Sequence, residues 1–329
     1  MRINFNSLNL GLSGGNRFVF ELSNRLVKRG HEVTITHCGL AKNHKWFSEK
    51  LALINDVELS LFNRAYRKYV LKKKQWDFDF ERALQKSIPE CDVNVATYFS
   101  TAFPTYFSRK GKPFYLVQNF ESWFFEQDDQ NQMRAQVSYL LPMEKLCVSH
   151  WLADKVNGKY IGNGLNLSTF RKTCEKKYDP PYKIMVILRQ DVAWKNHWFI
   201  HETLQTLRNI HHVDFVVQEP KGLSDVELVK MYNDAHVLLF ASKFEGFGYP
   251  PLEAMACGTP VVTTNCLEYA SHGQNCLIAD SPESMAKNVE SLLQASSYRD
   301  YIIEGGLRTA RNYDFEKVVD RFADCVGCA

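Results

Sequence analysis

The chain has 329 residues, of which 45% are hydrophobic and 23% charged, and its net charge is +3. This length exceeds one typical domain and suits two. The nearly balanced charge disfavours a nucleic-acid-binding protein. Nine scattered cysteines predict reduced thiols in a cytoplasmic protein. The amino terminus lacks an apolar signal core, and no apolar run approaches the roughly 18 residues of a membrane span.

The amino-terminal segment predicts a β-loop-α-β unit. Residues 2–8 have the pattern of a strand, a glycine-containing loop follows, and apolar spacing predicts a helix over residues 16–29 before the second strand, HEVTITH. The backbone amides of Gly14 and Gly15 suit a phosphate. The loop lacks the G-x-G-x-x-G pattern, and His37 stands near the place where a dinucleotide-binding fold carries an acidic residue. An NAD-dependent enzyme is therefore disfavoured.

A basic stretch, Arg64 to Lys74, has aromatic residues at helical spacing. It predicts an amphipathic helix that lies either on an anionic membrane surface or on its own domain, and the sequence leaves both open. Asp77 and Asp79 resemble a D-x-D metal motif but introduce a helix-like segment. We interpret them as helix-terminal charges and predict no metal site.

Two further buried strands are predicted over residues 92–99 and 112–120, and polar side chains stand at their ends. Tyr98, Gln118 and Asn119 are candidates for contact with an acceptor substrate. Trp123 follows them and either stacks on such a substrate or packs in the core.

The second half of the chain opens with a continuous apolar strand, KIMVILRQ, that is typical of a buried parallel sheet. Arg189 stands at the end of this strand, and Lys195 follows six residues later, before a helix predicted over residues 197–207. Ligands of open α/β sheets bind at the carboxyl ends of strands. Two cations at this place are suited to bind a diphosphate. The alternative is that Arg189 and Lys195 are an ordinary pair of surface cations with no ligand.

The most informative segment runs from Lys243 to Val262. Glu245 and Glu253 are eight positions apart, separated by two glycines and two prolines, and a helix is predicted over residues 252–257. The amides of residues 246–249 precede this helix, where an anion is favoured. The carboxylates of Glu245 and Glu253 flank this anion site and are placed to accept hydrogen bonds from hydroxyl groups on either side of it. A nucleoside diphosphate with a sugar at one end and a ribose at the other meets both demands.

This segment resembles the Glu-x7-Glu signature of glycosyltransferase family 4, which contains retaining, nucleotide-sugar-dependent enzymes of the GT-B fold. The downstream segment, residues 263–293, is also similar, with Cys276 where the family commonly has glycine. The resemblance implies that Glu245 faces the donor sugar and that Glu253 holds the ribose hydroxyls. It further implies that Arg189 and Lys195 hold the diphosphate. The family often has histidines near the ends of the amino-terminal strands, where this chain has Thr97, Tyr98, Gln118 and Asn119.

The residues assigned to roles fall into three sets. The predicted catalytic residues are Glu245, Arg189 and Lys195. The predicted donor-binding residues are Gly14, Gly15, Arg189, Lys195, Glu245, Gly246, Phe247, Gly248, Tyr249 and Glu253. The candidate acceptor-side residues are Tyr98, Gln118, Asn119 and Trp123.

The implied architecture is α/β, with two Rossmann-like α/β/α domains that face each other across a cleft. Residues 1–160 form the acceptor-side domain, onto which a carboxyl-terminal helix within 312–329 crosses back, and residues 161–311 form the donor domain. The implied reaction is hexosyl transfer, with retention, to a glycan, lipid-linked or other acceptor, without metal or cofactor, in the cytoplasm or at its membrane surface. Two alternatives stay open: a non-catalytic sugar-nucleotide-binding regulatory protein and a GT-B-like epimerase.

Overall fold

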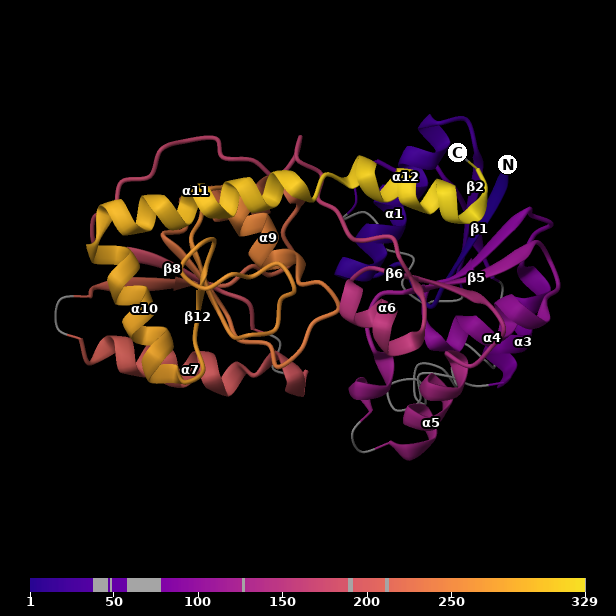
Figure 1. The fold of residues 1–329 in the computed structure, drawn as a ribbon, viewed down its shortest axis with the longest axis horizontal. Helices are drawn as coiled ribbons and strands as arrows, with labels where there is room; N and C mark the ends of the chain where they lie inside the picture. Colours follow the sequence, from indigo (N-terminus) through magenta and orange to yellow (C-terminus); the bar gives the residue numbers. More distant parts are fainter. Residues whose placement is uncertain are drawn as a thin grey trace. The chain divides into compact units, whose positions relative to one another are not determined.

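A computed structural model describes residues 1–37, 47, 49–57, 78–125, 128–188, 192–210 and 213–328, without the side chains of residues 78 and 79. The chain divides into two compact units (Figure 1). Unit 1 comprises Met1–Gly164 and Phe315–Ala329, and unit 2 comprises Leu165–Asp314. Each unit contains one parallel sheet with helices on both faces, so the predicted α/β class is confirmed.

Unit 1 contains a seven-stranded sheet with the order β3-β2-β1-β4-β5-β6-β7, and every neighbouring pair is parallel. The strands are β1 (Arg2–Ser7), β2 (Glu32–His37), β3 (Leu53–Asp56), β4 (Val93–Ala96), β5 (Lys112–Val117), β6 (Glu144–Cys147) and β7 (Lys159–Tyr160). The helices are α1 (Gly14–Lys28), α3 (Phe78–Ser87), α4 (Phe99–Phe107), the 3-10 turn η1 (Glu121–Phe124), α5 (Asp129–Ser138), α6 (His150–Val156) and α12 (Phe315–Val326). The strand order reverses between β1 and β4, and such a switch point is where open α/β sheets bind ligands.

Strands β1 and β4 carry buried asparagines in the middle of this sheet. Asn6 Nδ2 donates to Asn94 Oδ1 at 2.7 Å and to Thr105 Oγ1 at 2.8 Å, and Asn4 Nδ2 donates to Asn94 Oδ1 at 3.1 Å. Thr36 Oγ1 on β2 donates to Asn4 Oδ1 at 2.7 Å. Because buried amides are costly unless they are hydrogen-bonded, this network fixes how the central strands pair and how α4 sits on them.

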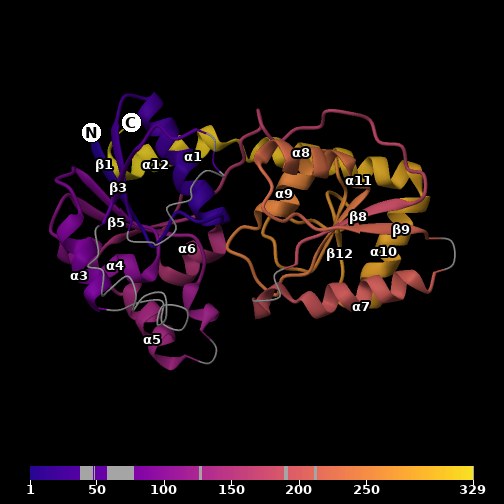
Figure 2. The same ribbon diagram turned by 180° about the vertical axis from the view of Figure 1, so that it is seen from behind.

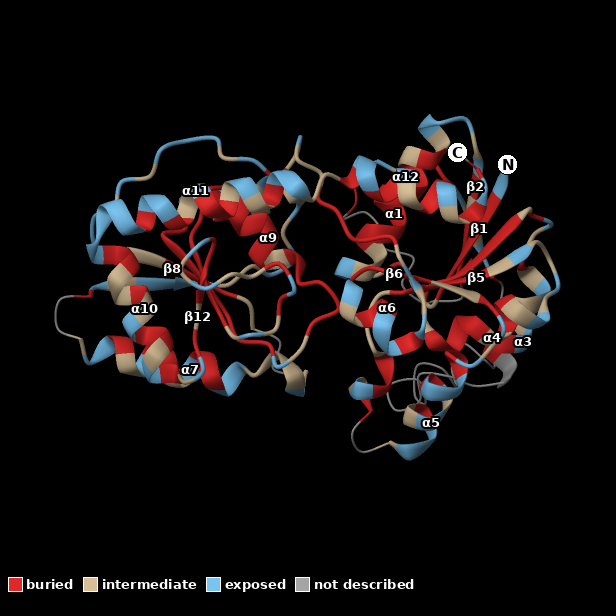
Figure 3. Cartoon of the chain, in the orientation of Figure 1, coloured by how far each residue is buried: buried red, intermediate tan, exposed pale blue. Residues whose placement is uncertain are grey.

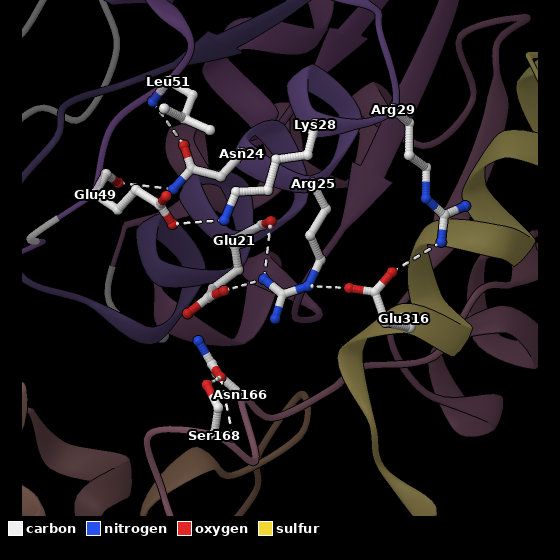
Figure 4. A network of polar contacts seen from close by, with 10 residues as sticks. All are labelled: Glu21, Asn24, Arg25, Lys28, Arg29, Glu49, Leu51, Asn166, Ser168 and Glu316. Carbon is white, nitrogen blue, oxygen red and sulfur yellow. Dashed lines mark hydrogen bonds and ion pairs between the residues drawn. The ribbon is translucent and has the colours of Figure 1, made fainter.

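The carboxyl-terminal helix α12 packs on α1 within unit 1. The rings of Phe18 and Phe315 lie 5.3 Å apart, and the Arg25 guanidinium lies 4.8 Å from the Phe315 ring centre. Arg25 also donates to Glu316 at 2.8 Å and pairs with Glu21, and Arg29 bonds Glu316 at 2.9 Å (Figure 4). Residues almost 300 positions apart are therefore joined into one core.

Unit 2 contains a five-stranded parallel sheet with the order β12-β11-β10-β8-β9. The strands are β8 (Tyr182–Val186), β9 (Phe215–Gln218), β10 (Val237–Phe240), β11 (Val261–Thr263) and β12 (Leu277–Ile278). The helices are the 3-10 turn η2 (Ala193–Lys195), α7 (His197–Arg208), α8 (Asp225–Asp234), α9 (Tyr249–Ala256), α10 (Pro282–Gln294) and α11 (Ser296–Asn312). Helices α7 and α10 cover one face, and α8, α9 and α11 cover the other (Figure 2). Figure 3 shows exposed residues along the outer face of α11, whereas α10 is mostly buried or partly buried.

Two helices begin earlier than the sequence predicted, each because of its capping residue. Helix α1 starts at Gly14 since Ser13 Oγ accepts a hydrogen bond from the Asn16 amide at 3.1 Å. Helix α9 starts at Tyr249 since Gly248, with φ of 87°, supplies the left-handed residue from which the helix begins. The prolines then occupy its first turn, as predicted.

Candidate functional site

The strand order of unit 2 reverses between β8 and β10, so their carboxyl ends mark the switch point of this sheet. The segment after β8 leads to Lys195, and the segment after β10 is the glycine-containing loop that opens α9. The topology thus brings together two stretches that the sequence predicted to share a ligand. Of the cation pair predicted there, Arg189 lies outside the described residues and Lys195 is described.

Lys195 and Glu245 form an ion pair at this switch point. Lys195 Nζ lies 2.5 Å from Glu245 Oε1, and the two side chains are 20% and 9% exposed. The Lys195 ammonium also lies 5.4 Å from the centre of the Phe240 ring. Because the pair is largely withdrawn from water, the lysine neutralises a carboxylate that would be costly to bury alone.

Two contacts hold the segment that carries Lys195 against the loop. The Lys243 amide donates to the Trp194 carbonyl at 2.8 Å, and the Trp194 and Phe244 rings stack with centres 5.7 Å apart. Asn196 has a φ of 52°, which ends η2 and begins α7. The position of Lys195 therefore depends on tertiary contacts between residues about 50 positions apart.

Gly248 is the tightest point of the loop. A β-carbon at this position would lie 2.3 Å from Leu267 Cδ2, and its positive φ adds strain for any other residue. Its carbonyl accepts a hydrogen bond from the Tyr269 hydroxyl. The neighbouring side chains of Phe247 and Tyr249 are buried, in contact with Tyr269 or with each other. These two side chains are therefore used in packing, and the predicted contribution of residues 246–249 to a ligand site is that of their backbone amides.

Glu253 lies one turn inside α9 and is 4% exposed. Its Oε2 accepts a hydrogen bond from the Tyr232 hydroxyl, on α8, at 2.8 Å. Sequence reasoning missed Tyr232, because nothing in the helix pattern of SDVELVKMYNDA distinguishes it from a core aromatic residue. Its contact with Glu253 makes it part of the candidate site.

In unit 1, Gly14 and Gly15 lie at the amino terminus of α1, after β1. A β-carbon on Gly15 would lie 3.2 Å from the amide oxygen of Gln118, which follows β5. The structure therefore brings a predicted donor-side glycine together with a predicted acceptor-side glutamine, across the carboxyl ends of β1 and β5.

The remaining acceptor-side candidates lie close to Gln118 in sequence or at the end of the adjacent strand. Tyr98 precedes α4, and Asn119 Oδ1 accepts the amide of Phe120 at 2.9 Å. Trp123 is 37% exposed and stacks on Trp151, with ring centres 5.6 Å apart. Trp151 lies on α6, and sequence reasoning missed it.

Several predictions concern residues that the structure does not describe. The whole basic stretch, Arg64 to Lys74, and Asp77 lie outside the described ranges, since residues 58–77 are not described. Within those ranges, no group of three or more His, Cys, Asp or Glu side chains is arranged to hold a metal ion. Within the same ranges, no helix is long and apolar enough to cross a membrane.

Residues 199–309 match the family of glycosyl transferases group 1. Escherichia coli O-antigen chain mannosyltransferase B is 34% identical over 95 residues, which cover 28% of this chain and 25% of that protein. A putative glycosyltransferase of Acidianus filamentous virus 2 is 26% identical over 164 residues, which cover 48% and 40%. The matched segments thus span less than half the length of these relatives.

Solved structures resemble the chain over its whole length. Sucrose-phosphate synthase from Thermosynechococcus elongatus matches with a TM-score of 0.82 at 13% identity, covering 98% of both chains. Anabaena HepE in complex with UDP-glucose matches with a TM-score of 0.74 at 13% identity, covering 100% of both chains. The fold is that of GT-B glycosyltransferases, as the sequence predicted.

Proposed function

From the premise that this chain has the GT-B fold and carries a group 1 glycosyltransferase segment, we propose that it transfers a hexosyl group from a nucleoside-diphosphate sugar to an acceptor. The observation that carries the proposal is the Lys195–Glu245 pair at the switch point of unit 2, beside the loop that opens α9. Anabaena HepE, which has the same fold, holds UDP-glucose.

In the proposed donor site, the diphosphate binds to Lys195, Arg189 and the amides of residues 246–249. Amides at a helix amino terminus and a lysine ammonium both favour a phosphate anion. They stabilise the negative charge that develops on the leaving diphosphate as the bond to the sugar breaks, so no metal ion is required.

Glu245 takes the sugar end of the donor and Glu253 the ribose end. Glu253 lies inside α9, one turn beyond the amides, and the resemblance to the Glu-x7-Glu signature implies that a hydroxyl bound there is on the nucleoside side of the diphosphate. The Tyr232 hydroxyl holds its carboxylate in position. Glu245 lies before the amides, where the anomeric carbon of a bound sugar would lie.

We place the acceptor on unit 1, at the carboxyl ends of its strands, where Gln118, Asn119, Tyr98 and Trp123 lie. A glycan or lipid-linked acceptor suits the exposed Trp123 ring, since sugars stack on aromatic faces.

We further propose retention of the anomeric configuration, with the departing phosphate oxygen accepting the acceptor's proton on the face that it leaves. We also propose a cytoplasmic protein, with the Arg64–Lys74 stretch on an anionic membrane surface.

The test is a transfer assay of the full chain with UDP-, GDP-, ADP- and dTDP-sugars, in excess EDTA, with glycan and lipid acceptors. We expect an acceptor-dependent product whose anomeric configuration matches that of the donor by proton NMR. An inverted product would overturn retention, and activity that requires added manganese would overturn metal independence. Donor binding without transfer would favour a regulatory sugar-nucleotide-binding protein, and release of isomerised sugar would favour an epimerase.

A further inference from the structure

Glu121 is a buried carboxyl group that neither the sequence reasoning nor the proposed mechanism uses. It begins η1, directly after the loop that follows β5, and is 2% exposed. Its Oε2 accepts a hydrogen bond from the backbone amide of Phe99 at 2.6 Å and from the Tyr115 hydroxyl at 3.0 Å. The side chain thus has partners on two different elements.

The backbone around Glu121 is fixed by a third element. The Glu121 amide donates to the Tyr139 hydroxyl at 2.8 Å, and this hydroxyl donates to the Asn119 carbonyl at 3.3 Å. The Tyr139 ring stacks on Phe120 and on Tyr115, with centres 5.3 Å and 5.6 Å away. The segment 119–121 is therefore held by the residue that ends α5.

Phe99 is the first residue of α4, and its amide belongs to the helix amino terminus, where amides have no partner within the helix. A carboxylate there also interacts favourably with the helix dipole. Glu121 consequently joins the loop after β5 to the start of α4, which follows β4. Tyr98 and Gln118, two of the acceptor-side candidates, lie just beyond the carboxyl ends of these two neighbouring strands.

We propose that Glu121 is a positioning residue of the acceptor half-site: its carboxyl group fastens the segment 118–124 to the first turn of α4 and thereby sets Trp123 and Gln118 for the acceptor. The hydrogen bonds that fasten this segment lie within unit 1 and do not depend on the reaction. The role of the segment toward an acceptor rests on the glycosyl transfer proposed above.

The carboxyl group of Glu121, which makes these hydrogen bonds, is titratable. Burial raises the pKa of Glu121 to about 8, while the hydrogen bonds from Phe99 and Tyr115 act to lower it. Three tyrosines also surround the site, Tyr98, Tyr115 and Tyr139, and burial raises the pKa of each well above its ordinary value, so they stay neutral. Above pH 8 the ionised carboxylate accepts charge-assisted hydrogen bonds, which are stronger than neutral ones.

The first arm of the test needs no substrate. Trp123 lies two residues from Glu121, and the chain has six tryptophans, so the difference in fluorescence between a protein and its Trp123→Phe counterpart reports the environment of the segment. We expect this difference to show a transition near pH 8 in the wild type, Glu121→Gln to lack it, and Tyr115→Phe to move it to higher pH, because the anion loses a donor. An identical transition in Glu121→Gln, or an unshifted one in Tyr115→Phe, would overturn the fastening.

The second arm measures transfer from UDP-glucose to a panel of p-nitrophenyl glycosides. Glu121→Ala is expected to raise the acceptor KM about tenfold and to leave UDP affinity unchanged, whereas Glu121→Gln, which keeps an acceptor oxygen, is expected to retain much of the wild-type KM. Thr105→Val is the matched control, since it removes a buried hydrogen bond from the same helix without touching the segment.

The control is expected to lower the melting temperature and to keep the acceptor KM. An unchanged acceptor KM in folded Glu121→Ala, or an equal rise in Thr105→Val, would overturn the positioning role. If the wild type transfers nothing to any acceptor from UDP-, GDP-, ADP- or dTDP-sugars, the proposed function fails, while the fluorescence arm still decides whether Glu121 fastens the segment.

Discussion

The Tyr232 hydroxyl donates a hydrogen bond to Glu253 Oε2 at 2.8 Å, and both side chains are buried. The Tyr232 carbonyl in turn accepts a hydrogen bond from Lys176 Nζ at 3.2 Å, and the same ammonium donates to the Gly258 carbonyl at 3.1 Å. Lys176 thus joins the ends of α8 and α9. The orientation of Glu253 on α9 is consequently set from the neighbouring helix, which makes Tyr232 a positioning residue for Glu253, the carboxylate that we propose holds the donor's ribose.

Tyr232→Phe removes this hydroxyl and keeps the ring. We expect nucleoside diphosphate affinity to fall about tenfold or more by calorimetry, because a hydrogen bond to a charged group contributes on the order of 1.5–3 kcal/mol. Tyr301→Phe is the control, since Tyr301 is 53% exposed on α11, and its affinity should be that of the wild type. Wild-type affinity in folded Tyr232→Phe would contradict the assigned role.

Lys195→Met tests the ion pair with Glu245. We expect nucleoside diphosphate affinity to fall at least tenfold and the free energy of unfolding to fall by about 1–3 kcal/mol, since the buried carboxylate loses its partner. Adding Glu245→Gln to this variant should restore stability, because no unpaired charge remains, but should not restore affinity. Recovery of affinity in the double variant would mean that Lys195 acts only through Glu245.

Glu121 predicts a specific pH dependence of stability. Its pKa is raised from 4.5 to about 8 in the folded chain. Between these values the folded state binds more protons than the unfolded state, so its stabilising contribution is complete below about pH 4.5 and is lost as pH rises through 8. The free energy of unfolding of the wild type, minus that of Glu121→Gln, should therefore fall from pH 5 to 8 and level off above.

Urea titrations at several pH values measure this difference. Glu90→Gln is the control, since the Glu90 side chain is 76% exposed. A flat difference for Glu121→Gln, or a slope of the opposite sign, would contradict the raised pKa, because it would show that the Glu121 carboxyl ionises at least as readily in the fold as in water.

The contacts between α1 and α12 predict unequal costs for two arginines. Arg25 is 16% exposed, pairs with the buried Glu21 and lies over the Phe315 ring, whereas Arg29 is 35% exposed (Figure 4). Arg25→Met should lower the free energy of unfolding by about 1–3 kcal/mol, since Glu21 loses its partner, and Arg29→Met by less than about 1 kcal/mol. Chemical denaturation of both variants measures this, and equal costs would contradict the account of α12 docking.

Local signals in the sequence predicted a good part of the fold. The strand, glycine loop and helix at the amino terminus, and the prolines in the first turn of α9, follow from turn chemistry and periodicity that neighbouring residues express. The α/β class and the GT-B fold were both predicted correctly. Helix α9 begins three residues earlier than predicted, because the left-handed conformation of Gly248 starts it and this conformation depends on the fit against Leu267.

The contacts within the candidate site could not be predicted in the same way. Lys195 and Glu245 were assigned to one site, but their direct pairing depends on the stacking of Trp194 on Phe244. Tyr232 meets Glu253 only because α8 and α9 cover the same face of the sheet. Glu121 is bonded to an amide 22 positions earlier, and no local pattern marks that partner.

The most direct test of the donor site compares Glu245→Gln with Glu253→Gln. Calorimetry would measure the affinity of each variant for the nucleoside diphosphate that the wild type binds most tightly among UDP, GDP, ADP and dTDP, after melting curves show that both variants are folded. The account predicts about tenfold weaker binding in Glu253→Gln, which loses the ribose contacts. It predicts binding no weaker than that of the wild type in Glu245→Gln, because a bare nucleoside diphosphate has no sugar to reach that carboxylate and Lys195, freed from its ion pair, stays available for the diphosphate. Loss of affinity in Glu245→Gln together with wild-type affinity in Glu253→Gln would contradict the account and reverse the direction of the donor in the site.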